Sequence, residues 1–368
     1  MDFFPVKSRL TLYGHRIKYF KEVMKAKKML DNEIEHFKID DASRDKLYRS
    51  LVTYITYKPK SSLEYISAFF KSDITKVKDG KVKLNEVITI VPVKDDLVKI
   101  KEFIKYHNRI GLTNFVFIDN NSSDGTFEYL ISLENVEVFR VTEMFSSVKC
   151  QAWFNRVILD YGYDKWYLCL DSDEFFSSKY DFCDIHKLVE FLESRKQYRF
   201  RTMLLDMYAS NEWYKNGNPQ DFMKECIYYD YKGYSIYKTY QGYDVLGGVR
   251  KRIFDINPTL TKYPLFKFQD GDVFLQHLPL IYEKNDIASL DGVILHYKFL
   301  PNDIIKYEQY ALSEIHANNS YEYKKYVDKM NTNFIGFYDE NSSAKFIRAD
   351  EAIRLIEKGI RKKEKNND

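Results

Sequence analysis

Two aspartates separated by a single residue, Asp171 and Asp173, follow an apolar segment that ends at Leu170. Two carboxylates placed so close together are unfavourable unless a cation neutralises them. Hard divalent cations such as Mg²⁺ and Mn²⁺ prefer oxygen ligands and bridge phosphate groups. The pair therefore predicts a site that holds a divalent cation together with a diphosphate.

Two other polar segments also follow apolar runs: Val93-Lys94-Asp95-Asp96, and the stretch 119–126, which reads Asp-Asn-Asn-Ser-Ser-Asp-Gly-Thr. Taken alone, the second stretch could be a helix-capping turn, because Ser, Asn and Asp all cap helices. An isolated Asp-x-Asp triplet could equally be a pair of surface acids. Three acid-bearing segments in the same kind of position are a more specific signal, and they indicate one shared ligand site.

The elements that would position these segments alternate between strands and helices. Continuous apolar runs are typical of strands buried on both faces, and the segments between them have helical spacing. Successive units of this kind predict a doubly wound α/β domain with a mostly parallel sheet, whose ligands bind beyond the carboxyl ends of the strands. We expect strands at 87–93, 115–118, 136–141 and 166–170, and helices at 97–110, 124–133 and 148–161.

The flanking regions differ in character. Residues 1–85 are rich in Lys, Tyr and Glu and show no catalytic pattern; within them we expect a helix at 15–38 and a turn or short hairpin at 76–83. Residues 301–368 are charged and predicted helical, with a basic tail. Three parts follow: an α-rich N-terminal extension at 1–85, a main α/β domain at 86–300, and the C-terminal helical region. Within the main domain, strand-like pieces are expected at 201–205, 249–254 and 293–299.

Composition excludes several classes of protein. The chain has 368 residues, 45% of them hydrophobic and 30% charged, which indicates a folded protein. A net charge of +3 is too small for a dedicated nucleic-acid binder. The four cysteines form no CxxC pair, which argues against a disulfide framework or a thiolate zinc site. With no apolar run near the roughly 20 residues of a membrane span and no signal core, we expect a cytoplasmic protein.

Several short motifs, taken in their order along the chain, resemble those of GT-A-fold glycosyltransferases of the family 2 type, in the subgroup that also resembles family 92. The resemblance covers about residues 86–300. In two respects the sequence departs from the group: its first strand ends in Lys-Asp-Asp where Lys-Asn-Glu is more usual, and no clear Glu-Asp or Asp-Asp word supplies a base. The matching words are VPVKDD at 91–96, FIDNNSSDGT at 117–126, WYLCLDSDEFF at 166–176, MLLDMY at 203–208, GGVRKR at 247–252, KYPL at 262–265 and LHYKF at 295–299.

The resemblance implies roles for individual residues. It divides the domain into a nucleotide-sugar-binding half at 86–176 and an acceptor half at 177–300. Asp171 and Asp173 would hold the sugar nucleotide and its metal, Mn²⁺ or Mg²⁺, and His296 would be a late metal ligand, with His277 as the alternative. The remaining nucleotide-sugar contacts would come from Val93, Asp95, Asp119, Asn121, Arg250 and Arg252.

The two arginines alternate along the expected strand 249–254, so they would share one face and could neutralise the leaving diphosphate. A solvated edge is the plainer interpretation of Arg250 and Arg252, and a strand histidine paired to backbone is the plainer one of His296. A carboxylate would deprotonate the acceptor hydroxyl, with inversion at the anomeric carbon. Asp206 and Asp230, which follow apolar or aromatic runs, are the candidates for this base.

The function predicted on these grounds is metal-dependent transfer of a sugar, from a UDP-sugar in the first instance, to a saccharide or lipid-linked acceptor. The setting implied by the resemblance is bacterial surface polysaccharide synthesis. A basic cluster after apolar residues at 353–360 could also bring the chain to the inner face of the membrane, although a solvated helix end explains it equally well. That cluster comprises Lys358, Arg361, Lys362, Lys363 and Lys365.

Two other functions remain open from the sequence. A nucleotidyltransferase also uses paired acids and a metal, but it would show a Gly-rich basic loop after the first strand, where this chain has Lys94-Asp95-Asp96. A non-catalytic carbohydrate-binding protein would have no need of the acid pair. The glycine motifs of P-loop kinases and dinucleotide-binding dehydrogenases are absent from the sequence.

Overall fold

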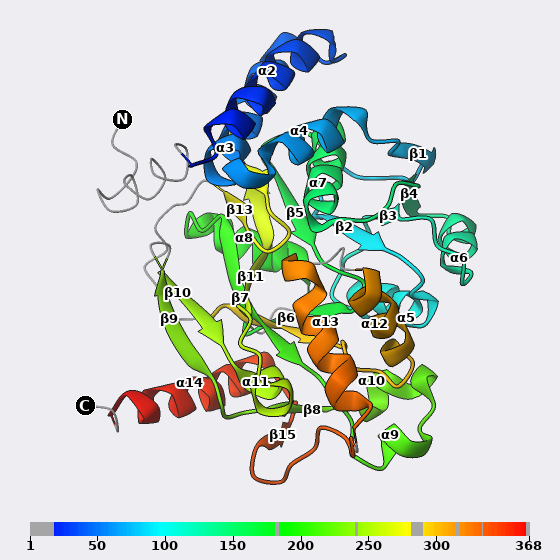
Figure 1. Cartoon of the computed structure of the whole chain (residues 1–368), viewed down its shortest axis with the longest axis vertical. Helices are drawn as coiled ribbons and strands as arrows, with labels where there is room; N and C mark the ends of the chain where they lie inside the picture. Colours follow the sequence, from blue (N-terminus) through cyan, green and yellow to red (C-terminus); the bar gives the residue numbers. More distant parts are fainter. Residues whose placement is uncertain are drawn as a thin grey trace.

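The chain folds around a nine-stranded mixed β-sheet with helices on both faces, and so it belongs to the predicted α/β class (Figure 1). The computed structural model describes residues 18–180, 184–239, 242–280, 290–313, 317–332 and 334–365. In spatial order, the strands of the sheet are β1 (Thr75–Lys78), β4 (Val136–Arg140), β3 (Phe115–Asp119), β2 (Ile88–Val93), β5 (Lys165–Cys169), β11 (Thr261–Phe268), β7 (Arg199–Asp206), β14 (Gly292–His296) and β6 (Glu174–Ser178).

The first half of the sheet is parallel, as the sequence predicts. Strands β4, β3, β2 and β5 are neighbours and all run the same way, so their carboxyl ends lie at one edge. The second half is mixed, because β11 runs antiparallel to both β5 and β7, while β14 is parallel to β7 and antiparallel to β6. Parallel neighbours need a long crossover connection, usually a helix. Full helices follow β2, β3 and β4, whereas only short ones follow β7.

Three of these crossover helices have nearly the predicted boundaries. The main difference among the helices is that the second begins at Thr126, two residues after the predicted start. Among the strands, the main difference is that β5 ends at Cys169, so Leu170 lies just beyond it. The second helix begins late because Gly125 has a positive φ of 94° and Asp124 accepts a hydrogen bond from the Thr126 backbone N–H. Ser146 caps the third by accepting from the Lys149 N–H. The helices are α5 (Leu97–Asn108), α6 (Thr126–Ser132) and α7 (Ser147–Tyr161).

The core lies on both faces of the sheet. One face packs against α5, against α8 (Ile185–Ser194) and against the C-terminal helix α14 (Ala349–Lys365). The other face packs mainly against α7. Because both faces are covered, the strands are apolar along their whole length, which is why they are legible in the sequence.

The N-terminal extension is helical, as predicted, and packs on the α7 side of the molecule (Figure 1). The helix expected at 15–38 runs from Phe20 to His36, and its first residues lie outside the described ones. The hairpin expected at 76–83 is wrong, since Thr75–Lys78 pairs antiparallel with the distant β4 and forms a sheet edge. The helices are α2 (Phe20–His36), α3 (Asp41–Tyr57), η1 (Pro59–Ser61) and α4 (Ser62–Lys71).

The strand expected at 249–254 is also wrong. This segment is a helix, α11 (Gly248–Phe254), and it starts at two glycines with positive φ. Val249 and Phe254 are buried and Ile253 packs beside them, a spacing that fits one face of a helix better than strand alternation. Arg250 and Arg252 therefore do not share a strand face.

The region after β14 is helical, as predicted. In this region α12 (Asp303–Ser313) and α13 (Ala317–Met330) pack against each other. No helix among the described residues is long and apolar enough to cross a membrane. The remaining elements are α9 (Trp213–Asn216), η2 (Pro219–Asp221), α10 (Phe222–Glu225), β8 (Tyr228–Asp230), β9 (Ser235–Thr239), β10 (Gly242–Leu246), β12 (Val273–Phe274), β13 (Pro279–Leu280) and β15 (Ser343–Lys345).

Candidate functional site

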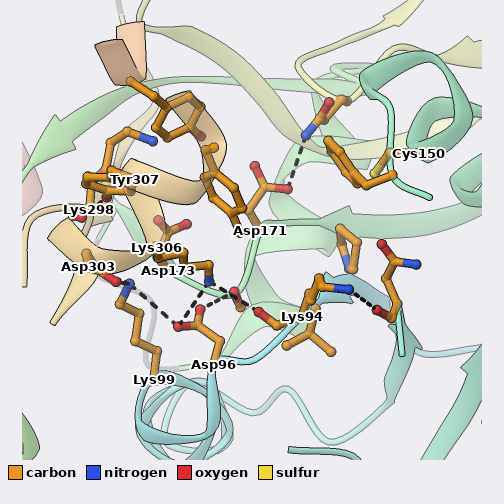
Figure 2. A pocket seen from close by; sticks show the side chains of 18 of the residues that line it. Lys94, Asp96, Lys99, Cys150, Asp171, Asp173, Lys298, Asp303, Lys306 and Tyr307 are labelled. Carbon is orange, nitrogen blue, oxygen red and sulfur yellow. Dashed lines mark hydrogen bonds and ion pairs between the residues drawn. The ribbon is translucent and has the colours of Figure 1, made fainter. Parts of the chain in front are cut away.

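A cavity of about 310 Å³ lies beyond the carboxyl ends of β2 and β5, with α12 and α13 along one side (Figure 2). One end of its wall is apolar, and the rest carries charges of both signs together with tyrosines and uncharged polar side chains. The apolar end consists of Pro92, Val93, Met144, Phe145, Cys150 and Trp153. The charged residues are Lys94, Asp96, Lys99, Asp171, Asp173, His296, Lys298, Asp303 and Lys306.

Both members of the predicted acid pair line this cavity. The Asp171 side chain is 31% exposed; its Oδ2 lies 3.6 Å from Lys262 Nζ, and its Oδ1 accepts a 3.4 Å hydrogen bond from Gln276. Asp173 Oδ2 lies 3.4 Å from His296 Nε2. Burial acts to raise the pKa of Asp173, but His296, with Lys99 and Lys298, holds it well below its usual range. Asp173 is therefore an anion at any physiological pH.

His296 connects the acid pair to a buried ion pair behind it. Its Nδ1 lies 2.7 Å from Asp206 Oδ1, and Asp206 accepts two 2.8 Å hydrogen bonds from Arg250. Burial acts to lower the pKa of His296, but Asp173 and Asp206 raise it above the ordinary value. Burial likewise acts to raise the pKa of Asp206, yet Arg250 and His296 hold it far below normal. A carboxylate held in this way is a weak base.

A fully buried lysine lies beneath the acid pair. Lys262 donates to Glu174 Oε1 at 2.7 Å and also contacts Asp171, so the chain itself supplies a cation to this part of the wall. Burial acts to lower the pKa of Lys262, but Asp171 and Glu174 raise it above its usual value. The backbone N–H of Asp171 donates to Glu174 at 2.9 Å, which fixes the turn between β5 and β6.

The α5 side of the cavity holds a second cluster of charges that sequence reasoning missed. Lys99 donates to both carboxylate oxygens of Asp303, at 2.9 and 3.0 Å, and lies 3.6 Å from Asp96. Lys306 Nζ lies 3.9 Å from Asp96 and donates to the Lys94 carbonyl. The one sequence signal for this cluster is a lysine at a buried position of α5, one turn after Asp96.

Several predicted donor-binding residues are near the cavity without lining it. Asp119 is fully buried at the end of β3, where it accepts from the Ser122 N–H at 3.2 and 3.3 Å. Asp95 accepts from the Ser123 N–H, and Asn121 accepts from Arg140 at 2.9 Å. The cavity is lined instead by the neighbouring Asp96 and Asn120, together with the predicted Val93.

Other predicted residues belong to structural interactions around the site. Arg252 donates twice to Asp230, at 2.7 Å each, and once to the Phe337 carbonyl. Burial raises the pKa of Asp230. His277 does not line the cavity, and burial together with the charge of Lys262 lowers its pKa to about 4. Asp230 and His277 stay predictions as base and metal ligand.

The residues present do not form a ready metal centre. Asp171 and Asp173 offer the oxygen ligands that Mg²⁺ and Mn²⁺ prefer. Their nearest charged neighbours, however, are Lys262 and His296, and no group of three or more His, Cys, Asp or Glu side chains that could hold a metal occurs among the described residues.

Comparison with known proteins gives a likeness only to solved structures, and it is distant. No protein-family model and no curated protein matches the sequence. Among solved structures, the chain is similar to the mannosyltransferase PcManGT from Pyrobaculum calidifontis in complex with GDP-Man and Mn²⁺, at 15% identity and a TM-score of 0.23. The similarity covers 49% of this chain, and it spans about half the length of that one.

Proposed function

We propose that the chain is a glycosyltransferase that moves a sugar from a nucleotide-sugar donor, a UDP-sugar in the first instance, to a saccharide or lipid-linked acceptor. The observation that carries this proposal is the cavity itself, which brings an apolar end, an acid pair and several lysines together at the carboxyl edge of an α/β sheet. Ligands of open α/β sheets bind at this edge. A volume of about 310 Å³ falls within the range of small-molecule sites.

A nucleotide-sugar would match the chemistry of each part of the wall. The apolar end with Phe145 and Trp153 suits the flat face of a base. Lysines suit the diphosphate, since ammonium groups bind phosphate as point charges. The carboxylate of Asp173 suits the hydroxyl groups of the donor sugar, which donate hydrogen bonds to it.

The transfer needs a base for the acceptor hydroxyl and a positive environment for the leaving diphosphate. Asp206 and Asp230 remain candidates for the base, but each is held by an arginine. Asp171 is the most accessible carboxylate of the cavity wall, and we propose it as the better-placed base. Direct displacement by the activated hydroxyl would invert the anomeric centre, as the sequence resemblance implies.

The wider setting is carried by the sequence resemblance alone. It comprises bacterial surface polysaccharide synthesis, a cytoplasmic site of action, and the division at residues 176 and 300. Residues after 300, including Lys306 and Tyr307, also line the cavity, so the C-terminal helical region would take part in binding. Mn²⁺ or Mg²⁺ stays the predicted cofactor, and adding or omitting each metal in a binding assay tests it.

Thermal unfolding with added nucleoside diphosphates tests the proposal, because a ligand that binds only the folded state raises the melting temperature. We expect a rise with UDP, and the same screen with GDP and ADP, each with and without Mn²⁺ or Mg²⁺, identifies the base and the metal requirement. Hydrolysis of the matching nucleotide-sugar would then report the donor. The absence of a shift with every nucleoside diphosphate, with and without metal, would contradict the proposal.

Two further assays separate the alternatives. A nucleotidyltransferase would release pyrophosphate from a nucleoside triphosphate in the presence of a sugar phosphate. A carbohydrate-binding protein would be stabilised by saccharides and by no nucleotide.

A further inference from the structure

Lys298 differs from the other buried and half-buried lysines of the cavity wall, because no counter-ion lies beside it among the described residues. Lys99 is paired with Asp303, and Lys306 lies 3.9 Å from Asp96. Lys94 is exposed to water and donates to the Asn120 carbonyl at 3.1 Å. Among the described residues, no carboxylate lies within ion-pair distance of the Lys298 ammonium group. No described residue accepts a hydrogen bond from this group.

Tyrosine rings surround this ammonium group in place of a carboxylate. Its Nζ lies 5.7 Å from the ring centre of Tyr307, 5.1 Å from that of Tyr323 and 5.8 Å from that of Tyr326. Figure 2 shows Lys298 beside Tyr307 on one side of the cavity, with Lys94 on the other side. Ring faces attract a cation, but they neutralise none of its charge.

A lysine ammonium group is positively charged at neutral pH. A half-buried cation without a counter-ion is unfavourable. Because the Lys298 ammonium group faces a cavity, an anion that enters from solution can bind to it and neutralise its charge.

We propose that Lys298 binds the diphosphate of the donor and stabilises the charge of that diphosphate as it leaves. The proposal rests on the proposed function, because the nucleotide-sugar supplies the anion. It gives the region after β14 a definite role, since Lys298 itself and the α12 and α13 tyrosines around it come from that region. Lys298 would thus be a residue of the chain itself that neutralises charge on the diphosphate.

Calorimetric titrations in the presence of EDTA with UDP, uridine and inorganic pyrophosphate test the inference. The variants are Lys298→Gln and Lys298→Met; the second keeps the length of the apolar stem among the tyrosines and so guards against misfolding. The control is Lys325→Gln, an exposed lysine that also lies over a tyrosine ring, Tyr321, outside the cavity wall.

We expect both Lys298 variants to bind UDP and pyrophosphate about 10- to 100-fold more weakly, the loss of one charged hydrogen bond, with uridine unchanged. The control should bind all three as the wild type does. UDP affinity within about twofold of wild type in both variants, or an equal loss for uridine, would overturn the inference and leave the proposed function intact. Lys298-dependent binding of pyrophosphate without binding of any nucleotide would support the inference as a phosphate site and contradict the glycosyltransferase.

Discussion

At the scale of single residues, the neighbours of Asp173 determine whether its charge stabilises or destabilises the fold. From the sequence, Asp171 and Asp173 are two carboxylates that repel each other, and removing one should leave stability unchanged or slightly raised. In the structure each carboxylate faces a cation instead, Lys262 for one and His296 for the other. The charge of Asp173 therefore stabilises the fold as well as facing the cavity.

We expect Asp173→Ala and Asp173→Asn to lower glycosyl transfer by several orders of magnitude, because the variants lose an anion that would stabilise the positive charge developing at the anomeric carbon of the donor. The assay is initial rate with the donor identified by thermal shift. Because the pKa of Asp173 is depressed, its contribution to stability is present above its unfolded pKa of about 3.9 and is lost as the pH falls. We therefore also expect both variants to melt at a lower temperature at neutral pH.

The exposed Asp328, on α13, provides the control, and Asp328→Asn should retain wild-type activity and melting temperature. Residual activity above about a tenth of wild type in Asp173→Ala, a loss of less than about 1.4 kcal/mol, would show that Asp173 is not part of the reacting site.

At the scale of elements, a buried histidine ties α5 to β6, the strand that begins immediately after Asp173. His107 is fully buried; its Nδ1 lies 2.8 Å from the Phe103 carbonyl and its Nε2 lies 3.2 Å from the Phe176 backbone nitrogen. A carbonyl only accepts and a backbone N–H only donates, so the ring is neutral with its proton on Nδ1. Burial lowers the pKa of His107 to about 3.

This histidine makes stability depend on pH in a defined direction. Between its folded pKa of about 3 and its unfolded pKa of about 6.5, the unfolded chain binds a proton that the folded chain does not. Stability is thus fully present above about pH 6.5 and lost as the pH falls below it. Urea unfolding of wild type should show this loss, and His107→Gln should reduce its slope by up to about 1.4 kcal/mol per pH unit.

The exposed His36 on α2 is the matched control, and His36→Gln should leave the wild-type slope in place. An identical slope in His107→Gln and wild type would mean that His107 is protonated in the folded protein or is hydrated there.

At the scale of the whole molecule, the C-terminal helix is part of the core and not a free amphipathic surface. Ile353, Ile356 and Ile360 are buried against the main hydrophobic cluster, and α14 contacts β14 and β6. This part of α14 therefore has no free apolar face that could insert into a membrane. The predicted membrane contact would depend on the positive charge of exposed residues such as Lys358.

We expect any binding of the chain to vesicles of anionic lipid to be purely electrostatic. Sedimentation at low salt should then show binding that disappears at about 0.5 M salt, where charges are screened within a few ångströms. Vesicles of neutral lipid are the control and should bind nothing. Binding that survives high salt, or that occurs on neutral vesicles, would contradict the buried position of the isoleucine face.

The sequence alone determined the α/β class and the four parallel strands, and it predicted a shared ligand site at the carboxyl ends of those strands. These follow from local patterns, because a strand buried on both faces is apolar throughout and its carboxyl end is the first polar position after it. The sequence could not resolve α11, since a short segment with Arg250 and Arg252 two apart fits strand alternation as well as a helix.

Only the tertiary structure decided which charges meet. Lys99 pairs with Asp303, which is 204 residues away in the sequence, and Lys262 pairs with Glu174, which is 88 residues away. It also separated Asp96, on the cavity wall, from the adjacent Asp95, which holds the neighbouring loop. Such pairings depend on long-range packing that brings distant segments to one edge, and no local spacing in the chain encodes it.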